Sequence, residues 1–117
     1  MKKIIAITIG IFALYSCETH TYEDLQNEPV VEGDITYTTH IQPLVAANCV
    51  NCHSTEGSAS FRPLGSYAEL KDAVLTTNLL ERIHSQNGEP ILMPPTGRMP
   101  QVNIDLITEW NAAGMPE

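Results

Sequence analysis

Apolar residues recur at spacings of three and four in four stretches of the chain, the pattern of helices with one buried face. The predicted helices cover residues 38–47, 66–75, 78–84 and 103–113. The side chains expected to face inward are Ile41, Leu44, Val45, Leu70, Ala73, Val74, Leu79, Leu80, Ile83, Ile104, Ile107 and Trp110. No stretch has the strict alternation of a half-buried strand. The pattern therefore predicts an all-α fold.

Polar residues and a proline mark where the first two long helices should begin. Thr38 or Thr39 can cap the first helix, and Pro43 is tolerated there only in the first turn. Ser66 and Glu69 have the spacing of a capping box, in which each residue satisfies a free backbone N–H of the other. The second helix is therefore expected to begin directly after Ser66.

The last predicted helix follows a segment rich in proline. Residues 91–100 hold three prolines, one glycine and two methionines. Proline fits neither a helix interior nor a central strand, so this segment is predicted to be a stiff loop. Asn103 is the expected cap of the helix that follows, and Gly114 its C-terminal stop.

Residues 1–16 are predicted to be a signal peptide for secretion. Lys2 and Lys3 give a positive start, and residues 4–14 form an apolar run of eleven residues. A run of that length is too short to span a bilayer as a helix, and it matches the apolar region of a signal peptide.

The predicted signal peptide ends in Leu-Tyr-Ser-Cys at residues 14–17, which resembles a bacterial lipobox. In this interpretation Cys17 is lipidated and becomes the new N-terminus, and several acyl chains make the anchor stable. The alternative is an ordinary signal peptide with Cys17 incidental, although a free thiol is a liability in an oxidising compartment. Residues 17–34 are polar and acidic, which predicts a flexible tether ahead of a folded domain at residues 35–117. We therefore expect a protein of the bacterial cell envelope, periplasmic or surface-facing, with the outer membrane favoured over the inner one.

The charge of the chain limits its partners. The formal net charge is −8, and removal of Lys2 and Lys3 leaves four basic against fourteen acidic residues. Nucleic acid is excluded as a partner, because binding it requires a basic footprint. An acidic surface suits a redox partner protein with a basic docking patch, since opposite potentials speed encounter. Acidity that only keeps the protein soluble is the alternative.

Residues 49–53, Cys-Val-Asn-Cys-His, carry the strongest chemical signal in the chain. Cys-x-x-Cys-His is the attachment motif of a c-type haem. Cys49 and Cys52 can each form a thioether bond to a vinyl group, and the adjacent His53 can then reach the iron as its proximal ligand. One covalent haem c would also supply an apolar centre, which two Phe, four Tyr and one Trp build only thinly by themselves.

Two other uses of the cysteine pair fit the sequence less well. A structural zinc site built on Cys49, Cys52 and two histidines would need a second spaced ligand pair, and the sequence has none. A thioredoxin-like redox pair would lie at a strand-to-helix turn of a βαβ unit, which the chain does not offer.

Residues 35–117 resemble a class I type cytochrome c domain, particularly the small haem domains of bacterial surface lipoproteins. The resemblance rests on the helix leading into residues 49–53, on Met93-Pro94-Pro95, and on a C-terminal helix that carries Trp110 and ends at Gly114. It implies a small helical domain wrapped around one covalent haem, with the first and last helices crossing beside it. The residues expected at that crossing are Ile41, Leu44, Ile107 and Trp110.

The second axial ligand must come from a loop on the opposite face of the haem. Met93 lies forty residues after His53 in the proline-stiffened loop, and the resemblance favours it because a methionine before Pro-Pro is the usual ligand in the family. Met99 also precedes a proline and is the alternative ligand, with His84 as a further one. Either methionine can instead fill a gap in the core.

The resemblance also implies contacts around the haem. A metal-bound imidazole usually donates its second N–H to a fixed acceptor, and the Pro63 carbonyl is the expected acceptor for His53. Arg62 and Arg98 are candidates to pair with haem propionates, with ordinary surface exposure as the alternative for both.

These features predict a one-electron carrier outside the cytoplasm, able to serve as the haem subunit of a redox complex, and not an enzyme. His53 and Met93 would fill both axial positions of the iron and leave none for a substrate, and a thioether ligand raises the reduction potential. The alternatives are a haem enzyme or ligand sensor with an open sixth position, and a structural zinc lipoprotein.

Overall fold

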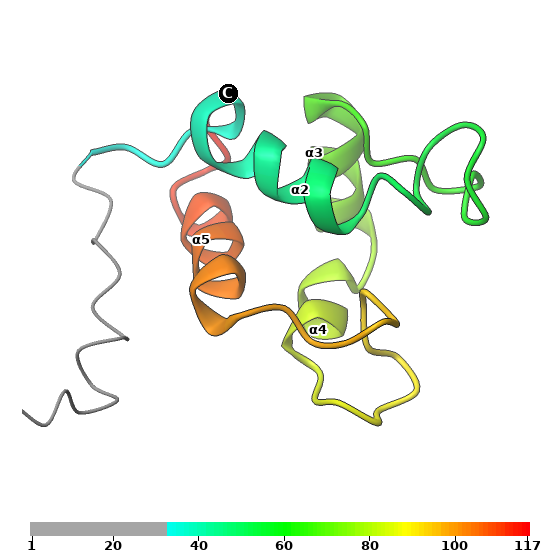
Figure 1. Cartoon of the computed structure of the whole chain (residues 1–117). Helices are drawn as coiled ribbons and strands as arrows, with labels where there is room; N and C mark the ends of the chain where they lie inside the picture. The colour runs from blue at the N-terminus through cyan, green and yellow to red at the C-terminus, as the bar shows by residue number, and fades with distance from the viewer. Residues whose placement is uncertain (1–32) are drawn as a thin grey trace, which may run out of the picture. The chain divides into compact units, whose positions relative to one another are not determined.

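In the computed structural model, which describes residues 33–117, every regular element is a helix (Figure 1). The elements are a π-helical turn η2 (Tyr37–Ile41) and the α-helices α2 (Gln42–Asn48), α3 (Tyr67–Thr76), α4 (Leu79–His84) and α5 (Gln101–Ala112). No strand occurs in this part of the chain, so the predicted all-α class is confirmed. The predicted signal peptide, Cys17 and the tether up to residue 32 lie outside the described residues.

The first helical segment begins before its predicted caps. Thr38 and Thr39 lie inside η2 with exposed side chains, so the prediction that one of them caps the helix is wrong. The turn begins after Thr36, whose backbone N–H donates to Nδ1 of His40 at 3.1 Å. The His40 ring therefore satisfies the N–H of the cap residue itself, the part that a Glu or Gln side chain plays in a capping box. Pro43 lies in the first turn of α2, as predicted.

The second predicted helix has the start that the sequence indicates. Ser66 and Glu69 form both bonds of the capping box, with the Ser66 N–H donating to Oε2 of Glu69 at 2.9 Å. Helix α3 follows directly and ends at Thr76, one residue beyond the predicted end. Helix α4 lies within the predicted range 78–84, and its Ile83 is buried.

Helix α5 (Gln101–Ala112) begins three residues earlier than predicted. Its cap position is Pro100, and Asn103 lies inside the first turn with its N–H donating to the Pro100 carbonyl at 3.1 Å, so the prediction that Asn103 is the cap is wrong. Gly114 ends the helix as predicted. Its φ of +87° is one that glycine adopts without strain.

The predicted inward-facing residues form one buried cluster. Ile41, Leu44, Ile107 and Trp110 all belong to it, and η2 packs against α5 (Figure 1). Leu79 and Leu80 are only half-buried against this cluster, because α4 has a single turn and a half and buries mainly Ile83. No helix in residues 33–117 has the length and apolar character needed to cross a bilayer.

The end of the chain seals this core. Ring centroids of Tyr37, Tyr67 and Trp110 lie 5.3 to 6.3 Å apart. The Trp110 indole N–H and the Tyr37 backbone N–H both donate to the Pro116 carbonyl, at 2.8 and 2.9 Å. The Tyr67 hydroxyl donates to the Met115 carbonyl at 2.8 Å. The Trp110 indole, the Tyr67 hydroxyl and the Tyr37 backbone N–H therefore all have partners in residues 115–116.

Candidate functional site

The Cys-x-x-Cys-His motif is wound as a turn onto the C-terminal end of α2. The Cys49 N–H donates to the Val45 carbonyl at 2.8 Å, and the His53 N–H donates to the Cys49 carbonyl at 2.9 Å. The side-chain amide of Asn48 donates to the Leu44 carbonyl and satisfies another group at the helix end. The backbone bonds thus fix the motif at the point where α2 stops.

Both cysteines, His53 and Met93 line one cavity of about 470 Å³. Its walls are mostly apolar and include Val45, Leu64, Leu70, Ala73, Ile83 and Ile107. Cavities of this size and character are typical of small-molecule and cofactor sites, which span roughly 300–1,000 Å³. The structure therefore places Met93 at the same apolar cavity as Cys49, Cys52 and His53, although Met93 lies at least forty residues further along the chain.

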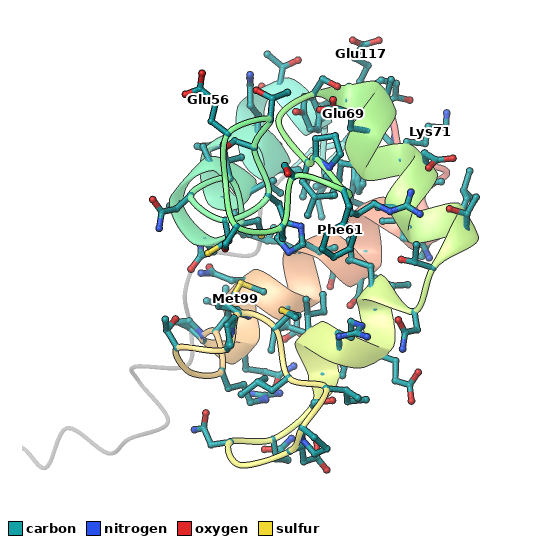
Figure 2. The ribbon with its side chains drawn as sticks, turned by 90° about the vertical axis from the view of Figure 1, so that its right-hand side faces the viewer. Glu56, Phe61, Glu69, Lys71, Met99 and Glu117 are labelled. Atoms are coloured by element: carbon teal, nitrogen blue, oxygen red, sulfur yellow. The ribbon has the colours of Figure 1, made fainter. Side chains whose placement is uncertain are left out.

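The three candidate distal ligands occupy different surroundings. Met93 lies on the cavity wall and is half-buried. Met99, in the segment just before α5 (Figure 2), is 3 % exposed, belongs to the hydrophobic core and does not line the cavity. His84 is exposed, and its Nδ1 lies 2.7 Å from the Leu80 carbonyl of its own helix. Of the three, only Met93 shares the cavity with His53.

The loop that carries Met93 is fastened to the neighbouring helix and loop. The Met93 N–H donates to the Arg82 carbonyl near the end of α4 at 3.2 Å, and the Met93–Pro94 peptide bond is cis. Further along, the Arg98 N–H donates to Oδ1 of Asn87 at 2.8 Å. The predicted stiff loop is thus confirmed as a segment without helix or strand, held in place by backbone bonds.

The second ring nitrogen of His53 has a backbone acceptor, but not the predicted one. Nδ1 of His53 lies 2.8 Å from the carbonyl of Arg62, so the prediction of the Pro63 carbonyl is wrong by one residue. The Leu64 N–H, two residues further along the same loop, donates to the His53 carbonyl at 2.8 Å. The loop is therefore bonded to both the ring and the backbone of His53.

The loop between the motif and α3 folds back over Cys52. The Ala59 N–H donates to the Cys52 carbonyl at 2.9 Å. A Cβ atom at Gly57 would collide with that same carbonyl, so this close approach requires glycine. The sequence pattern places Gly57 only in a polar loop, because its contact with Cys52 depends on how that loop closes.

The arginines of the site differ in their contacts. Arg62 lines the cavity and pairs with Asp72 at 2.8 Å. Arg98 does not line it. Nη2 of Arg98 donates to Gln101 at 2.6 Å, and its buried Nε has no partner among residues 33–117. Arg82 also lines the cavity, with its Nε donating to Oδ1 of Asn78 at 2.9 Å. Pairing of Arg62 or Arg98 with haem propionates stays a prediction.

Burial controls the chemistry of the first thiol. It raises the pKa of Cys49 to about 11, so this thiol is protonated at neutral pH. Cys49 and Cys52 are both free thiols. In residues 33–117, no group of three or more His, Cys, Asp or Glu side chains is arranged to hold a metal ion.

Comparison with known proteins identifies no family for this chain. No protein-family model matches the chain, and no curated protein or solved structure matches it. The resemblance to class I cytochromes c therefore rests on the motif, on Met93-Pro94-Pro95 and on the terminal helices. The function has to be argued from the cavity itself.

Proposed function

We propose that this protein is a lipid-anchored, extracytoplasmic one-electron carrier that holds one covalent haem c. The observation that supports the proposal is a single apolar cavity with Cys49, Cys52, His53 and Met93 on its wall. The donor set fits the group: two thiols at the spacing of the attachment motif, an imidazole beside them, and a thioether on a separate loop.

Each of these residues has a distinct role in the proposal. Haem iron supplies a centre that alternates between the ferrous and ferric states. Cys49 and Cys52 would hold the porphyrin covalently, so that the haem could not dissociate from the protein. His53 would be the proximal ligand through Nε2, because its Nδ1 faces the Arg62 carbonyl. Met93 would be the distal ligand, and its thioether favours the ferrous iron.

The aliphatic part of the remaining wall would keep water away from the haem. Leu64, Leu70 and Ile107 present aliphatic groups to the cavity, and none of them can act as an acid, a base or a nucleophile. If His53 and Met93 both bound the iron, no position on it would be left for a substrate. We therefore favour a carrier over a haem enzyme or ligand sensor, which needs an open sixth position, and over a structural zinc lipoprotein.

A pyridine haemochrome spectrum tests the central assignment. The full chain would be produced in cells that attach haem c, purified, denatured and measured beside a metal analysis. One haem c per chain and no stoichiometric zinc is the expected result. Zinc without haem would establish the zinc alternative. Haem with rapid carbon monoxide binding to the reduced wild-type protein would establish the enzyme or sensor.

The anchor and the partner belong to the same proposal. Cys17→Ser should release the protein from the membrane fraction and leave the haem spectrum unchanged, because the tether contributes no ligand. Membrane association that survives a high-salt wash in this variant would contradict the lipid anchor. The acidic composition favours a redox partner with a basic docking patch, so the electron-transfer rate between them should fall as salt is added.

A further inference from the structure

We propose that the ion pair between Arg62 and Asp72 positions the proximal histidine, by fixing the carbonyl group that accepts the N–H of its imidazole. The inference rests on the proposed haem function and assigns a residue pair that governs how the haem iron is held. Arg62 is then a positioning residue with two tasks, one for its backbone and one for its side chain.

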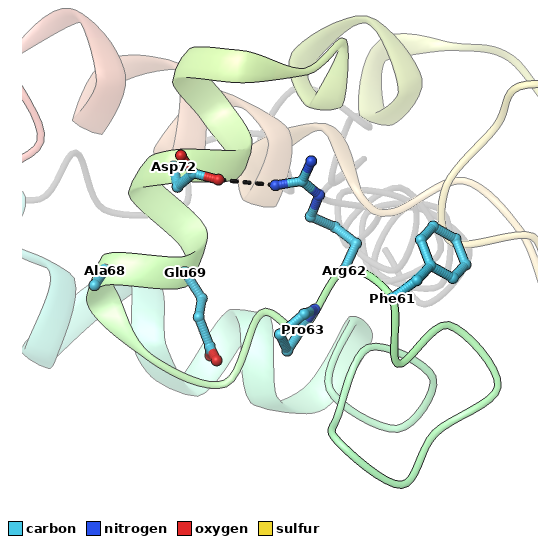
Figure 3. Close-up of a pocket in the computed structure, with 6 residues that line it drawn as sticks. All are labelled: Phe61, Arg62, Pro63, Ala68, Glu69 and Asp72. Atoms are coloured by element: carbon cyan, nitrogen blue, oxygen red, sulfur yellow. Dashed lines mark hydrogen bonds and ion pairs between the residues drawn. The ribbon is translucent and has the colours of Figure 1, made fainter.

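Both contacts of Arg62 are short. Its carbonyl oxygen lies 2.8 Å from Nδ1 of His53, and its Nη1 donates to Oδ2 of Asp72, also at 2.8 Å. Figure 3 shows the side chain of Arg62 reaching across to Asp72 on α3. Since the two contacts leave the same residue in different directions, the side chain restrains the orientation of the carbonyl.

Asp72, the partner in this ion pair, belongs to a helix that borders the cavity. It lies in the middle of α3, and the Thr76 hydroxyl donates to its carbonyl at 2.8 Å and lies 3.5 Å from its Oδ2. Leu70 and Ala73, its neighbours on α3, are buried and line the cavity. The ion pair therefore ties the loop of Arg62 to a helix that is part of the cavity wall.

Little else holds the outer side of this loop. The side chain of Phe61 is 86 % exposed and borders the cavity. The Arg62 N–H donates back to Ala59 within the loop at 3.0 Å, and the Leu64 N–H donates to His53. The position of the carbonyl thus depends on these backbone bonds and on the ion pair. Because both charged side chains are partly exposed, their loss should change stability little.

The chemistry predicts a sign for the effect. A strong hydrogen bond from Nδ1–H makes the imidazole a more basic ligand, which favours the ferric iron. Loosening that bond should therefore raise the reduction potential. The direct effect of charge is different: loss of the Arg62 cation would lower the potential, and loss of the Asp72 anion would raise it. Positioning predicts the same sign for both losses, whereas charge alone predicts opposite signs.

The experiment compares Arg62→Met, Asp72→Asn and the wild type, each with haem attached. Two quantities would be measured: the reduction potential, and the exchange rate of the His53 ring N–H with solvent by NMR of the reduced protein. We expect both variants to raise the potential and to speed the exchange several-fold. Lys71→Met removes a cation from the same helix, next to Asp72, and is the matched control. It should leave the exchange rate unchanged.

A charge-swapped double variant, Arg62→Asp with Asp72→Arg, should bring the exchange rate back toward the wild-type value. Opposite shifts of potential in the two single variants, or unchanged exchange in both, would overturn the positioning role and leave the haem assignment standing. If a single variant proved unstable, the double variant would decide between restored and unrestored protection. A wild-type protein without haem would overturn the proposed function and this inference with it.

Discussion

The two sides of this small domain differ in how completely they bury their side chains. On one side, η2, α5 and the tail bury Ile41, Ile104 and Trp110 almost completely, and backbone carbonyls satisfy the buried indole and phenol groups. On the other side, the motif turn and the Met93 loop surround a cavity of about 470 Å³ with side chains that stay half-exposed. Helix α5 contributes to both sides, because its Trp110 lies in the closed core and its Ile107 lines the cavity.

Substitutions on the two sides should also change different properties of the protein. A residue of the closed core should matter for the free energy of unfolding, and a residue of the cavity wall should matter mainly for the bound group. The following substitutions test that division, beginning with the largest expected effect.

Cys52→Ser should abolish covalent haem attachment, and Cys49→Ser should abolish it or leave a single thioether bond. The reason is that each thiol supplies one bond to a vinyl group. Haem staining after denaturing electrophoresis measures the result, with Asn51→Ala, at an exposed position between the cysteines, as the control. Haem retained through denaturation in both serine variants would show that the cavity is not used in this way.

Trp110→Ala should lower the free energy of unfolding by about 3–5 kcal/mol, because a fully buried indole and its bond to Pro116 are lost. Val102→Ala in the same helix, 40 % exposed, should change it by less than about 0.5 kcal/mol. Denaturant titration gives both values. A small effect of Trp110→Ala would mean that the closed core is not the source of stability.

The two methionines should fall on different sides of the division. Met93→Ala should let carbon monoxide bind the reduced haem and should lower the reduction potential, because the thioether ligand is gone. Met99→Ala should instead lower the free energy of unfolding by about 2–5 kcal/mol, since a buried core side chain is removed. Optical spectra with carbon monoxide and denaturant titration distinguish the two. Carbon monoxide binding in Met99→Ala alone would transfer the ligand role to Met99.

Ser66→Ala should have the smallest effect, about 1 kcal/mol on the free energy of unfolding, because α3 loses its capping hydroxyl. Ser60→Ala, at an exposed position in the preceding loop, should be neutral. Circular dichroism during denaturation measures both. The haem spectrum should not change in either variant, and a changed spectrum would mean that the helix start and the cavity wall are coupled.

The parts of the fold that could be predicted are those encoded over a few residues. The capping box at Ser66, the apolar face of α3 and the stop at Gly114 each depend on neighbours within one turn, and the structure has all three. The missed starts depend on contacts made elsewhere. The first turn begins early because Tyr37 is buried against Trp110, and no local pattern indicates this packing.

The candidate site likewise has residues that the sequence predicts and residues that it does not. Cys49, Cys52 and His53 follow from a local motif, and Met93 from its prolines and the resemblance. The Arg62 carbonyl was missed by one residue, since the orientation of a peptide group depends on backbone angles that the sequence does not specify. The pairing of Arg62 with Asp72 joins a loop to a helix ten residues later, and nothing in the spacing of the two residues indicates it.

The bond between the Tyr37 N–H and the Pro116 carbonyl has a consequence for the order of folding. The two residues are separated by almost the whole domain, and contacts between distant residues form slowly because a long loop must close first. During synthesis, residues 49–53 are available well before residues 115–116, which close the core. Any chemistry at the two thiols that requires an open chain has that interval in which to occur.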